Sequence, residues 1–336
     1  MRPFAFAPVV CCILAAQAPA PNDLTQAFNA NAQSINQMLN ALQFQEALAK
    51  AESMLPAEKP TLDGKDLNTL ATSSANHRAL VAIYKACANA AAASGNWEKA
   101  AEYLQKGAEA AKENHDTFKS LATQKAQDAL DQMKAGRAQT QKQWDELRPQ
   151  WVAKQDEYTK LQESLRAKSK RSKDEEATLA EVTEILPGIA ADIKTNDDKL
   201  KQFDAVIANN EKVVTQVGEM TAELAKAQTK AEEEVSSMQE KIKIQKDEIE
   251  KFNTDQIAKN KKNRKFKIDG NKNWVEAVVA DKANFEGKPT RDQATLLNRL
   301  LVLAPGNAKA LAALENVKAG RNAFDPGKKP SRKVGR

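Results

Sequence analysis

Apolar residues recur at alternating spacings of three and four over a long central stretch, from Leu179 to Phe252. They form two interleaved series, each with a period of seven. The first series is Leu179, Leu186, Ile193, Leu200, Ile207, Val214, Thr221, Gln228, Val235, Ile242 and Ile249, and the second is Val182, Ile189, Asn196, Phe203, Asn210, Val217, Leu224, Ala231, Met238, Gln245 and Phe252. An apolar repeat of about 3.5 residues sustained over this length is typical of a coiled coil. The pattern therefore predicts one continuous helical rod. Its few polar seam positions are expected to set register rather than to bind a ligand.

A second long helix is predicted before it, from Asp116 to about Lys168. Its seam consists of Leu130, Met133, Trp144, Leu147, Trp151, Tyr158, Leu161 and Leu165, with weaker positions at Arg137, Thr140 and Lys154. The register holds across Pro149, so we expect this proline to kink the helix and not to end it. The aromatic stripe of Trp144, Trp151 and Tyr158 is expected to pack in the core of the coiled coil.

Two sites could reverse the chain between these helices. Basic residues at 168–171 suit a helix C-terminus, and Ser172 with Glu175 forms a capping box for a new helix. The rival turn is Pro187-Gly188, but the seam keeps one register across it, so a kink is favoured there. The later helix would then outreach the earlier one by on the order of 50 Å. Its exposed seam would pair with a second copy, pack on the flanking helices, or bend back near Asn209-Asn210 into a three-helix bundle.

Shorter helices are predicted at both ends of the chain. Residues 22–55 form two helices, a third covers 76–93, and a fourth begins at Trp97 and ends near Ala111. After a basic link, residues 273–286, 290–304 and 308–319 form three more. Gly95-Asn96-Trp97-Glu98-Lys99-Ala100 is a turn followed by an aromatic and an alanine three residues later. The same aromatic-x-x-Ala step occurs at Phe44 and Ala47 and at Trp274 and Ala277.

These segments resemble the tetratricopeptide repeat, in which such a turn joins two closely packed helices. Leu303-Ala304-Pro305-Gly306-Asn307-Ala308 resembles the junction between two such repeats. The likeness covers roughly residues 24–112 and 271–320. It departs from the family in spacing, because Ala47 and Ala100 are farther apart than one repeat of about 34 residues. The resemblance implies repeat-packing roles for Phe44, Ala47, Gly95, Trp97, Ala100, Trp274, Ala277 and Pro305, and helical surfaces that bind a protein partner.

Charge is unevenly placed along this chain of formal charge +6. Residues 259–267 carry six basic residues and no acid, and the tail after residue 318 is also strongly basic. The remainder is slightly acidic. Lys261, Lys262, Arg264 and Lys265 are therefore candidate contacts to an anionic surface, such as lipid headgroups or an acidic envelope polymer. The alternative is a solvated helix end. Nucleic acid is an unexpected partner for an exported chain.

Export is indicated by residues 1–18, which have the features of a secretory signal. Arg2 supplies the positive start, and the apolar run from Phe4 to Ala16 is too short for a stable membrane anchor. Cleavage is expected after Ala16 or Ala18. An uncleaved anchor or a misassigned start is the alternative. The protein is thus expected to be periplasmic or secreted, and possible association with the envelope stays open.

Residues suited to catalysis are scarce. His77 and His115 are expected to be surface or capping residues, and Cys87 a small buried residue in an Ala-rich helix. Phosphate-binding glycine loops, nucleophile elbows and paired metal-ligand motifs do not occur in the sequence. The expectation is therefore a protein that is not an enzyme and that uses no cofactor or metal.

The predicted fold is all-α, with tetratricopeptide-like helical hairpins at both ends of a long antiparallel coiled-coil hairpin. The expected segments are a signal peptide (1–18), a helical domain (22–114), the coiled coil (115–258), a basic linker (259–272), C-terminal helices (273–319) and a disordered basic tail (320–336). The expected function is an exported scaffold of the cell envelope, with the coiled coil as spacer or dimerisation arm. The alternatives are a module that binds anionic surfaces and a regulator of a cell-wall enzyme.

Overall fold

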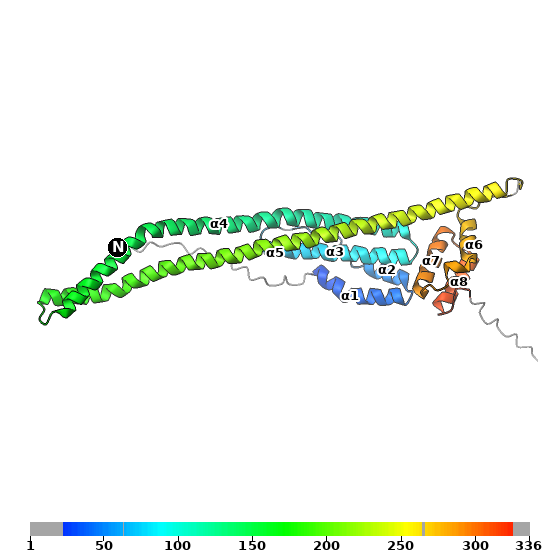
Figure 1. The fold of residues 1–336 in the computed structure, drawn as a ribbon. Coiled ribbons are helices and arrows are strands. Elements are labelled where there is room, and N and C mark those ends of the chain that lie inside the picture. Colours follow the sequence, from blue (N-terminus) through cyan, green and yellow to red (C-terminus); the bar gives the residue numbers. More distant parts are fainter. Residues whose placement is uncertain (1–22, 63, 264–265, 325–336) are drawn as a thin grey trace, which may run out of the picture. The chain divides into compact units, whose positions relative to one another are not determined.

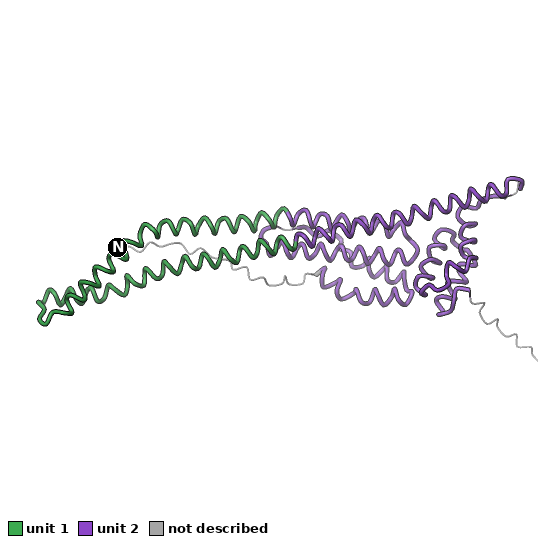
Figure 2. Tube along the Cα trace, viewed as in Figure 1, with its two compact units in different colours: residues 1–18, 120–220 green, residues 19–119, 221–336 purple. Residues whose placement is uncertain are grey.

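The computed structural model describes residues 23–62, 64–263 and 266–324. Over these ranges the protein is all-α, with eight α-helices, one short 3-10 helix and no strand (Figure 1). The helices are α1 (Asp23–Asn40), α2 (Phe44–Glu52), α3 (Leu67–Ala93), α4 (Trp97–Ala167), α5 (Lys173–Lys259), α6 (Lys272–Ala280), α7 (Thr290–Leu303) and α8 (Ala308–Lys318). Figure 2 shows the two compact units of the chain: unit 1 contains residues 120–220, and unit 2 contains the described residues of 19–119 and 221–336.

Unit 1 is an antiparallel pair made of the later part of α4 and the earlier part of α5. Polar side chains on the two helices contact each other in pairs whose numbers rise on α4 while they fall on α5. These pairs are Lys134 with Glu211, Arg137 with Asp204, Arg148 with Asp197, and Gln162 with Thr183. The order of these contacts fixes the antiparallel register.

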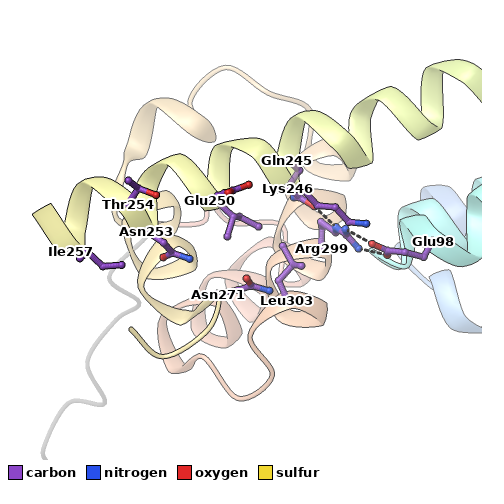
Figure 3. Close-up of a pocket in the computed structure, with 11 residues that line it drawn as sticks. Glu98, Gln245, Lys246, Glu250, Asn253, Thr254, Ile257, Asn271, Arg299 and Leu303 are labelled. Atoms are coloured by element: carbon purple, nitrogen blue, oxygen red, sulfur yellow. Dashed lines mark hydrogen bonds and ion pairs between the residues drawn. The ribbon is translucent and has the colours of Figure 1, made fainter. Parts of the chain in front are cut away.

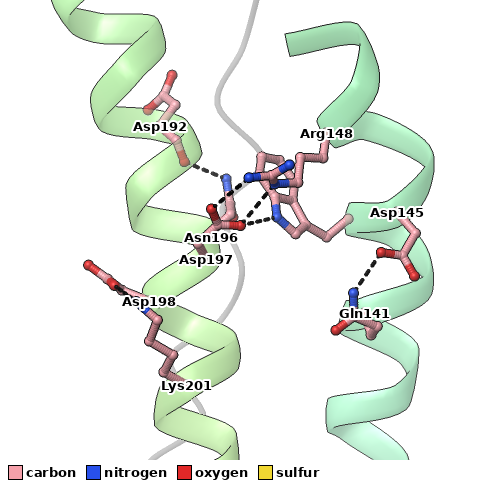
Figure 4. Close-up of polar contacts among 9 residues, drawn as sticks. Gln141, Asp145, Arg148, Asp192, Asn196, Asp197, Asp198 and Lys201 are labelled. Carbon is pink, nitrogen blue, oxygen red and sulfur yellow. Dashed lines mark hydrogen bonds and ion pairs between the residues drawn. The ribbon is translucent and has the colours of Figure 1, made fainter. Parts of the chain in front are cut away.

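The core of unit 1 is a narrow seam between these two helices. Trp144 is buried with Ile189, Ile193 and Leu200. The Trp144 indole Nε1 also donates a 2.7 Å hydrogen bond to Asp197, the carboxylate that Arg148 contacts in Figure 4. Trp151 and Tyr158 are half-buried against the same cluster, so the predicted packing of the aromatic stripe is confirmed.

The reversal between α4 and α5 occurs at residues 168–172, as the capping box predicts. The Ser172 backbone N–H donates to the Glu175 carboxylate at 2.9 Å, and the Glu175 backbone N–H donates to Ser172 Oγ at 3.3 Å. Arg171 Nη1 donates to the carbonyl oxygens of Leu165 and Lys168 at the end of α4. Pro149 and Pro187 both lie inside unbroken helices, so neither ends its helix.

Unit 2 is a multi-helix assembly. Helices α1 and α2 pack on each other and on α3, while α7 packs on α3, α6 and α8. The beginning of α4 and the later part of α5 join the same core through Ala100, Tyr103 and Ile249. Close packing against α3 is possible because this helix contributes alanines to the core, among them Ala88, Ala90, Ala91 and Ala93.

Every predicted seam position of α5 between Leu179 and Phe252 is buried or half-buried. In unit 1 the seam faces α4, and in unit 2 it faces that unit's own core, where Met238 and Phe252 pack against the central cluster. Of the three coverings considered for the long arm, packing on the flanking helices is the one observed. A bend at Asn209-Asn210 is excluded, because α5 is unbroken there.

Three boundary predictions are wrong. The predicted helix ending near Ala111 and the long helix starting at Asp116 are one helix, α4, because no glycine or proline interrupts residues 108–116. Consequently α4 has 71 residues and α5 has 87, a difference of 16 that corresponds to about 24 Å instead of 50 Å. Helix α3 begins at Leu67, because Asp66 caps it by accepting from the Thr69 N–H at 2.8 Å. Helix α6 ends at Ala280, before a 3-10 turn that Asp281 caps.

The prediction that Leu147 belongs to the seam of α4 is also wrong, because this residue is 44% exposed. Trp144 and Arg148, four residues apart, both reach Asp197 at this level of the hairpin. The face of α4 that contacts α5 therefore contains Trp144 and Arg148, and Leu147 lies beside that face.

The disordered tail was predicted to begin at residue 320, but Ala323 is buried and the Phe324 ring packs edge-on against Phe285. The predicted signal at 1–18 and the rest of the predicted tail, from residue 325, are outside the described residues. Among the residues that are described, none of the helices is both long and apolar enough to cross a bilayer.

Candidate functional site

An open hollow of about 380 Å³ lies in unit 2, alongside the last turns of α5 (Figure 3). Its volume is at the lower end of the range that is usual for ligand sites. One wall is a single face of α5, formed by Gln245, Lys246, Ile249, Glu250, Asn253, Thr254 and Ile257. The other walls are Arg299 and Leu303 of α7, Glu98 of α4 and Asn271 just before α6. Four separate segments therefore meet at this hollow.

Arg299 closes one end of the hollow, and its side chain is almost completely buried. Its Nη1 and Nη2 donate to the two carboxylate oxygens of Glu98 at 2.7 and 2.9 Å. Its Nε donates to Gln245 Oε1 at 2.8 Å, and Nη1 also donates to the Gly95 carbonyl at 3.1 Å. The guanidinium lies 4.8 Å from the ring centre of Trp97. One side chain of α7 thereby connects α4, α5 and the turn before α4.

The turn at Gly95 is built for this close approach. Gly95 has φ +84°, a left-handed conformation that favours glycine. A Cβ at this position would lie 2.4 Å from the backbone nitrogen of Arg299 and 2.4 Å from the backbone carbon of Asn298. Gly95 therefore lets the α3–α4 turn contact the backbone of α7 directly.

The charge of Arg299 is already balanced inside the fold. The bidentate bond from Arg299 is the main cause that lowers the pKa of Glu98 below its usual value, against the opposing effect of burial. Four of the five N–H donors of the guanidinium are bonded, the Trp97 ring lies beside it, and the side chain is almost completely buried. Arg299 thus organises the site and is not available to bind an anionic ligand.

The rest of the hollow mixes amides with aliphatic side chains. Asn253 Nδ2 donates to the Gly270 carbonyl at 3.4 Å, which orients its oxygen. Asn253 Oδ1 is shielded from solvent and has no hydrogen-bond partner among the residues that the structure describes. Ile249 is buried, Leu303 is half-buried, and Ile257 is 54% exposed. These groups can receive an apolar side chain beside a hydrogen-bond donor.

Most residues assigned to repeat packing lie in the core of unit 2. Phe44, Ala47, Ala100 and Trp274 are buried in its central cluster. Gly95 and Trp97 both contact Arg299, which the resemblance did not indicate.

Ala277 and Pro305 do not pack as expected. The buried face of α6 is formed by Trp274, Val275 and Val279, and Ala277 lies outside it, exposed. Pro305 is exposed in the turn after α7. The next helix starts there because Asn307 caps α8 by accepting from the Ala310 N–H at 2.9 Å.

Two of the four candidate anionic contacts are described, and both are exposed. Lys261 and Lys262 lie in the turn directly after α5, a few residues beyond the open end of the hollow. Arg264 and Lys265 lie outside the described residues.

The expectation that His77 is a surface or capping residue is wrong. His77 is fully buried in α3, because α4 continues past it and covers this face. Its Nδ1 lies 3.2 Å from the Ser73 carbonyl, and burial is the main cause that lowers its pKa. Ser74 Oγ, His77 Nε2 and Asn114 Oδ1 are buried nearby and lack partners within the described part of the chain. Because His77 Nδ1 faces a carbonyl, the neutral ring leaves Nε2 as an acceptor, so the group consists of two acceptors and one hydroxyl enclosed by packed helices, and we assign it no reaction.

Cys87 is confirmed as a small buried residue, and burial raises the pKa of its thiol to about 12. His115 is half-buried on α4, with Nδ1 3.0 Å from Asp116 Oδ1. Within the described ranges, His, Cys, Asp and Glu side chains form no group of three or more that could hold a metal ion.

Sequence reasoning missed Arg299, Glu98 and Asn253 as members of the site. The only available signal was Gln245, a polar residue at a seam position of α5, which was expected to set register. In the structure it is buried and accepts from Arg299. A buried polar seam residue thus indicated a partner from outside the coiled coil.

No family model matches this chain, and neither the curated proteins nor the solved structures provide a match to it.

Proposed function

We propose that this chain is an exported scaffold protein of the cell envelope, in which unit 2 binds a protein partner through tetratricopeptide-like helical surfaces and the α4–α5 hairpin of unit 1 acts as a coiled-coil spacer. The observation that carries the proposal is the hollow between α5 and α7, which joins apolar side chains to an unpartnered amide oxygen. Such mixed concave surfaces are suited to recognition.

The spacer role is supported by the way in which polar groups of unit 1 are used. Asp204 and Asp197 form ion pairs with arginines of the facing helix. Asn196 and Asn210 donate to carbonyl oxygens of their own helix at 2.9 and 3.0 Å. These polar side chains therefore make their contacts within the α4–α5 hairpin. Because the α5 seam is covered within unit 2, a second copy of the chain is not needed to bury it there, which favours a spacer over a dimerisation arm.

The experiment is affinity capture from the native envelope with the full mature chain, followed by identification of the bound proteins and sedimentation of the complex. A stoichiometric protein partner is expected. Recovery of the chain alone, at monomer mass and after mild crosslinking, would overturn the proposal.

A matched deletion tests the spacer separately. Removing residues 148–161 together with 182–195 takes two heptads from each arm and keeps the antiparallel register. The hairpin should shorten by about 21 Å, while capture of the partner stays unchanged. Loss of capture would mean that the hairpin itself binds the partner.

A further inference from the structure

The hollow is elongated along α5. Its lining residues on this helix run from Gln245 to Ile257, about 18 Å along the helix axis. Arg299 and Leu303 follow the same direction on α7. We call the hollow, seen along this axis, the slot. At about 3.3 Å per residue it accommodates roughly five residues of extended chain.

Two amide side chains that line the slot, Asn253 and Asn271, can hydrogen-bond to the main chain of such a segment. Asn253 lines the slot, and its Oδ1 is shielded from water and has no donor among the described residues, which is unfavourable. Its Nδ2 is held by a 3.4 Å contact to the Gly270 carbonyl, so a turn of the side chain would bring Oδ1 to a main-chain N–H in the slot. The Asn271 side chain makes no capping bond to α6, so it can also turn toward the slot, which it lines. An extended segment presents both N–H and C=O groups at regular intervals, whereas a lipid chain presents neither.

The apolar groups require an aliphatic side chain at one position of the segment. Ile249 and Leu303 form the deeper surface. Ile257, at the open end, is 54% exposed, more than any other large apolar side chain in the described ranges. Covering Ile257 would remove apolar area from water.

Charge distinguishes the two ends of the slot. At the closed end Glu98 is paired with Arg299, and the wall carries one residue of each sign, Lys246 and Glu250. Beyond Ile257 the exposed residues Lys259, Lys261 and Lys262 follow, in a run without acidic residues. A segment that leaves the slot at this end meets positive charge.

From these features we infer that the slot and the lysines after it bind an extended peptide segment of a protein partner, with an aliphatic residue against Ile249, Ile257 and Leu303 and acidic residues toward Lys259, Lys261 and Lys262. This inference rests on the proposed scaffold function and defines the chemistry of the partner.

The test uses the full mature chain and an array of synthetic decapeptides. Each peptide carries two aliphatic residues, placed before or after three glutamates, and control peptides replace the aliphatic residues by serine or the glutamates by lysine. The strongest binder is then measured by fluorescence anisotropy. Binding is expected for the aliphatic–acidic peptides and not for either control set.

Protein variants locate the site. Ile257→Ser should weaken binding about tenfold, the equivalent of about 1.4 kcal/mol. Lys261→Ala combined with Lys262→Ala should weaken it several-fold and reduce its dependence on salt. The matched control is Ile244→Ser, because Ile244 is 49% exposed on the same helix and does not line the hollow. It should bind as the unchanged chain does.

Three results would overturn the inference. The first is that no peptide of the array binds more strongly than the control peptides. The second is that Ile244→Ser and Ile257→Ser weaken peptide binding equally. The third is binding to anionic vesicles or an acidic polymer that depends on the lysines and not on Ile257, which would indicate a surface-binding module. If native capture of a partner persists undiminished in Ile257→Ser, the scaffold function stands and this site is wrong.

Discussion

Helices α4 and α5 contribute to both units, but they are held in different ways. In unit 1 each helix packs on the other, and the buried cluster is small: Trp144, Ile189, Ile193 and Leu200. In unit 2 the same two helices join a core that also includes α1, α2, α3, α6, α7 and α8. The heptad pattern on α5 does not change between them, so the surroundings and not the repeat decide how the seam is covered.

Polar seam residues show the same difference. In unit 1 Asn196 and Asn210 bond carbonyl oxygens of their own helix, and ion pairs bridge the helices at exposed positions. In unit 2 the half-buried Gln228 also bonds its own helix, through Glu232, but the buried Gln245 accepts from Arg299 of another helix. A half-buried polar seam residue can thus hydrogen-bond within its own helix, whereas a buried one in the multi-helix core bonds a residue of another helix.

The largest effect is expected for Gly95→Ala. The added methyl group would lie 2.4 Å from backbone atoms of α7, and φ +84° is unfavourable for alanine. We expect a loss of roughly 4 kcal/mol or more in the free energy of unfolding, measured by urea denaturation with circular dichroism. The control is Gly218→Ala in α5 of unit 1, where nothing lies within 4 Å of the new Cβ. It should stabilise the protein by about 0.5–1 kcal/mol. Equal stability of the two variants would refute the close contact of the turn with α7.

Arg299→Met should have the next largest effect. It leaves Gln245 buried without its donor and removes the contacts that join α7 to Gly95 and Glu98. Breaking a buried charged network of this kind costs about 3 kcal/mol. Arg291→Met is the control on α7, because Arg291 is exposed and makes one 3.4 Å contact, to Asn40. If both variants unfold at the same urea concentration, Arg299 is not a stabilising centre of unit 2.

A smaller, pH-dependent effect is expected from His77. Because burial lowers its pKa in the folded protein, the unfolded chain binds the proton more readily. Stability should therefore be full above the unfolded pKa of about 6.5 and should fall as the pH drops below it, until the folded pKa is passed. His77→Asn should flatten this slope in thermal unfolding between pH 7.5 and 5. A slope that persists in His77→Asn would assign the effect to another group.

The smallest effect is expected for Arg137→Ala in unit 1. The Arg137–Asp204 pair bridges α4 and α5 with a 2.7 Å contact, but Asp204 is more than half exposed. Exposed ion pairs contribute little to stability and are screened by salt. We expect a barely measurable change in the melting temperature at low salt and none at 0.5 M sodium chloride. A large loss at high salt would mean that unit 1 depends on its ion pairs and not on its narrow seam.

Much of the helical layout could be predicted from the sequence, because it depends on the spacing of residues that are close together in the chain. The α5 seam, the capping box of Ser172 and Glu175, and the passage of Pro187 through a helix were all predicted and are confirmed. The junction at residues 111–116 was misjudged, because His115 and Asp116 look like a helix start although no residue there breaks a helix.

The candidate site was less predictable, because it depends on contacts between residues far apart in the chain. Arg299 reaches Glu98, Gln245 and Gly95, which are separated from it by 54 to 204 residues. An arginine on a short helix carries no local sign of such burial. The burial of His77 is similar, since it depends on α4 continuing as a helix beyond Ala111. The basic run after α5 was recognised from charge alone, but its position next to a hollow was not.

The most direct test of the central claim is site-specific photo-crosslinking in the native envelope. A photoreactive phenylalanine analogue is placed at position 257 in unit 2, and at position 147 in unit 1, where Leu147 is 44% exposed. We expect a crosslinked protein partner from position 257 and none from position 147. A partner crosslinked from position 147 alone would contradict the assignment of partner binding to unit 2 and of spacing to unit 1.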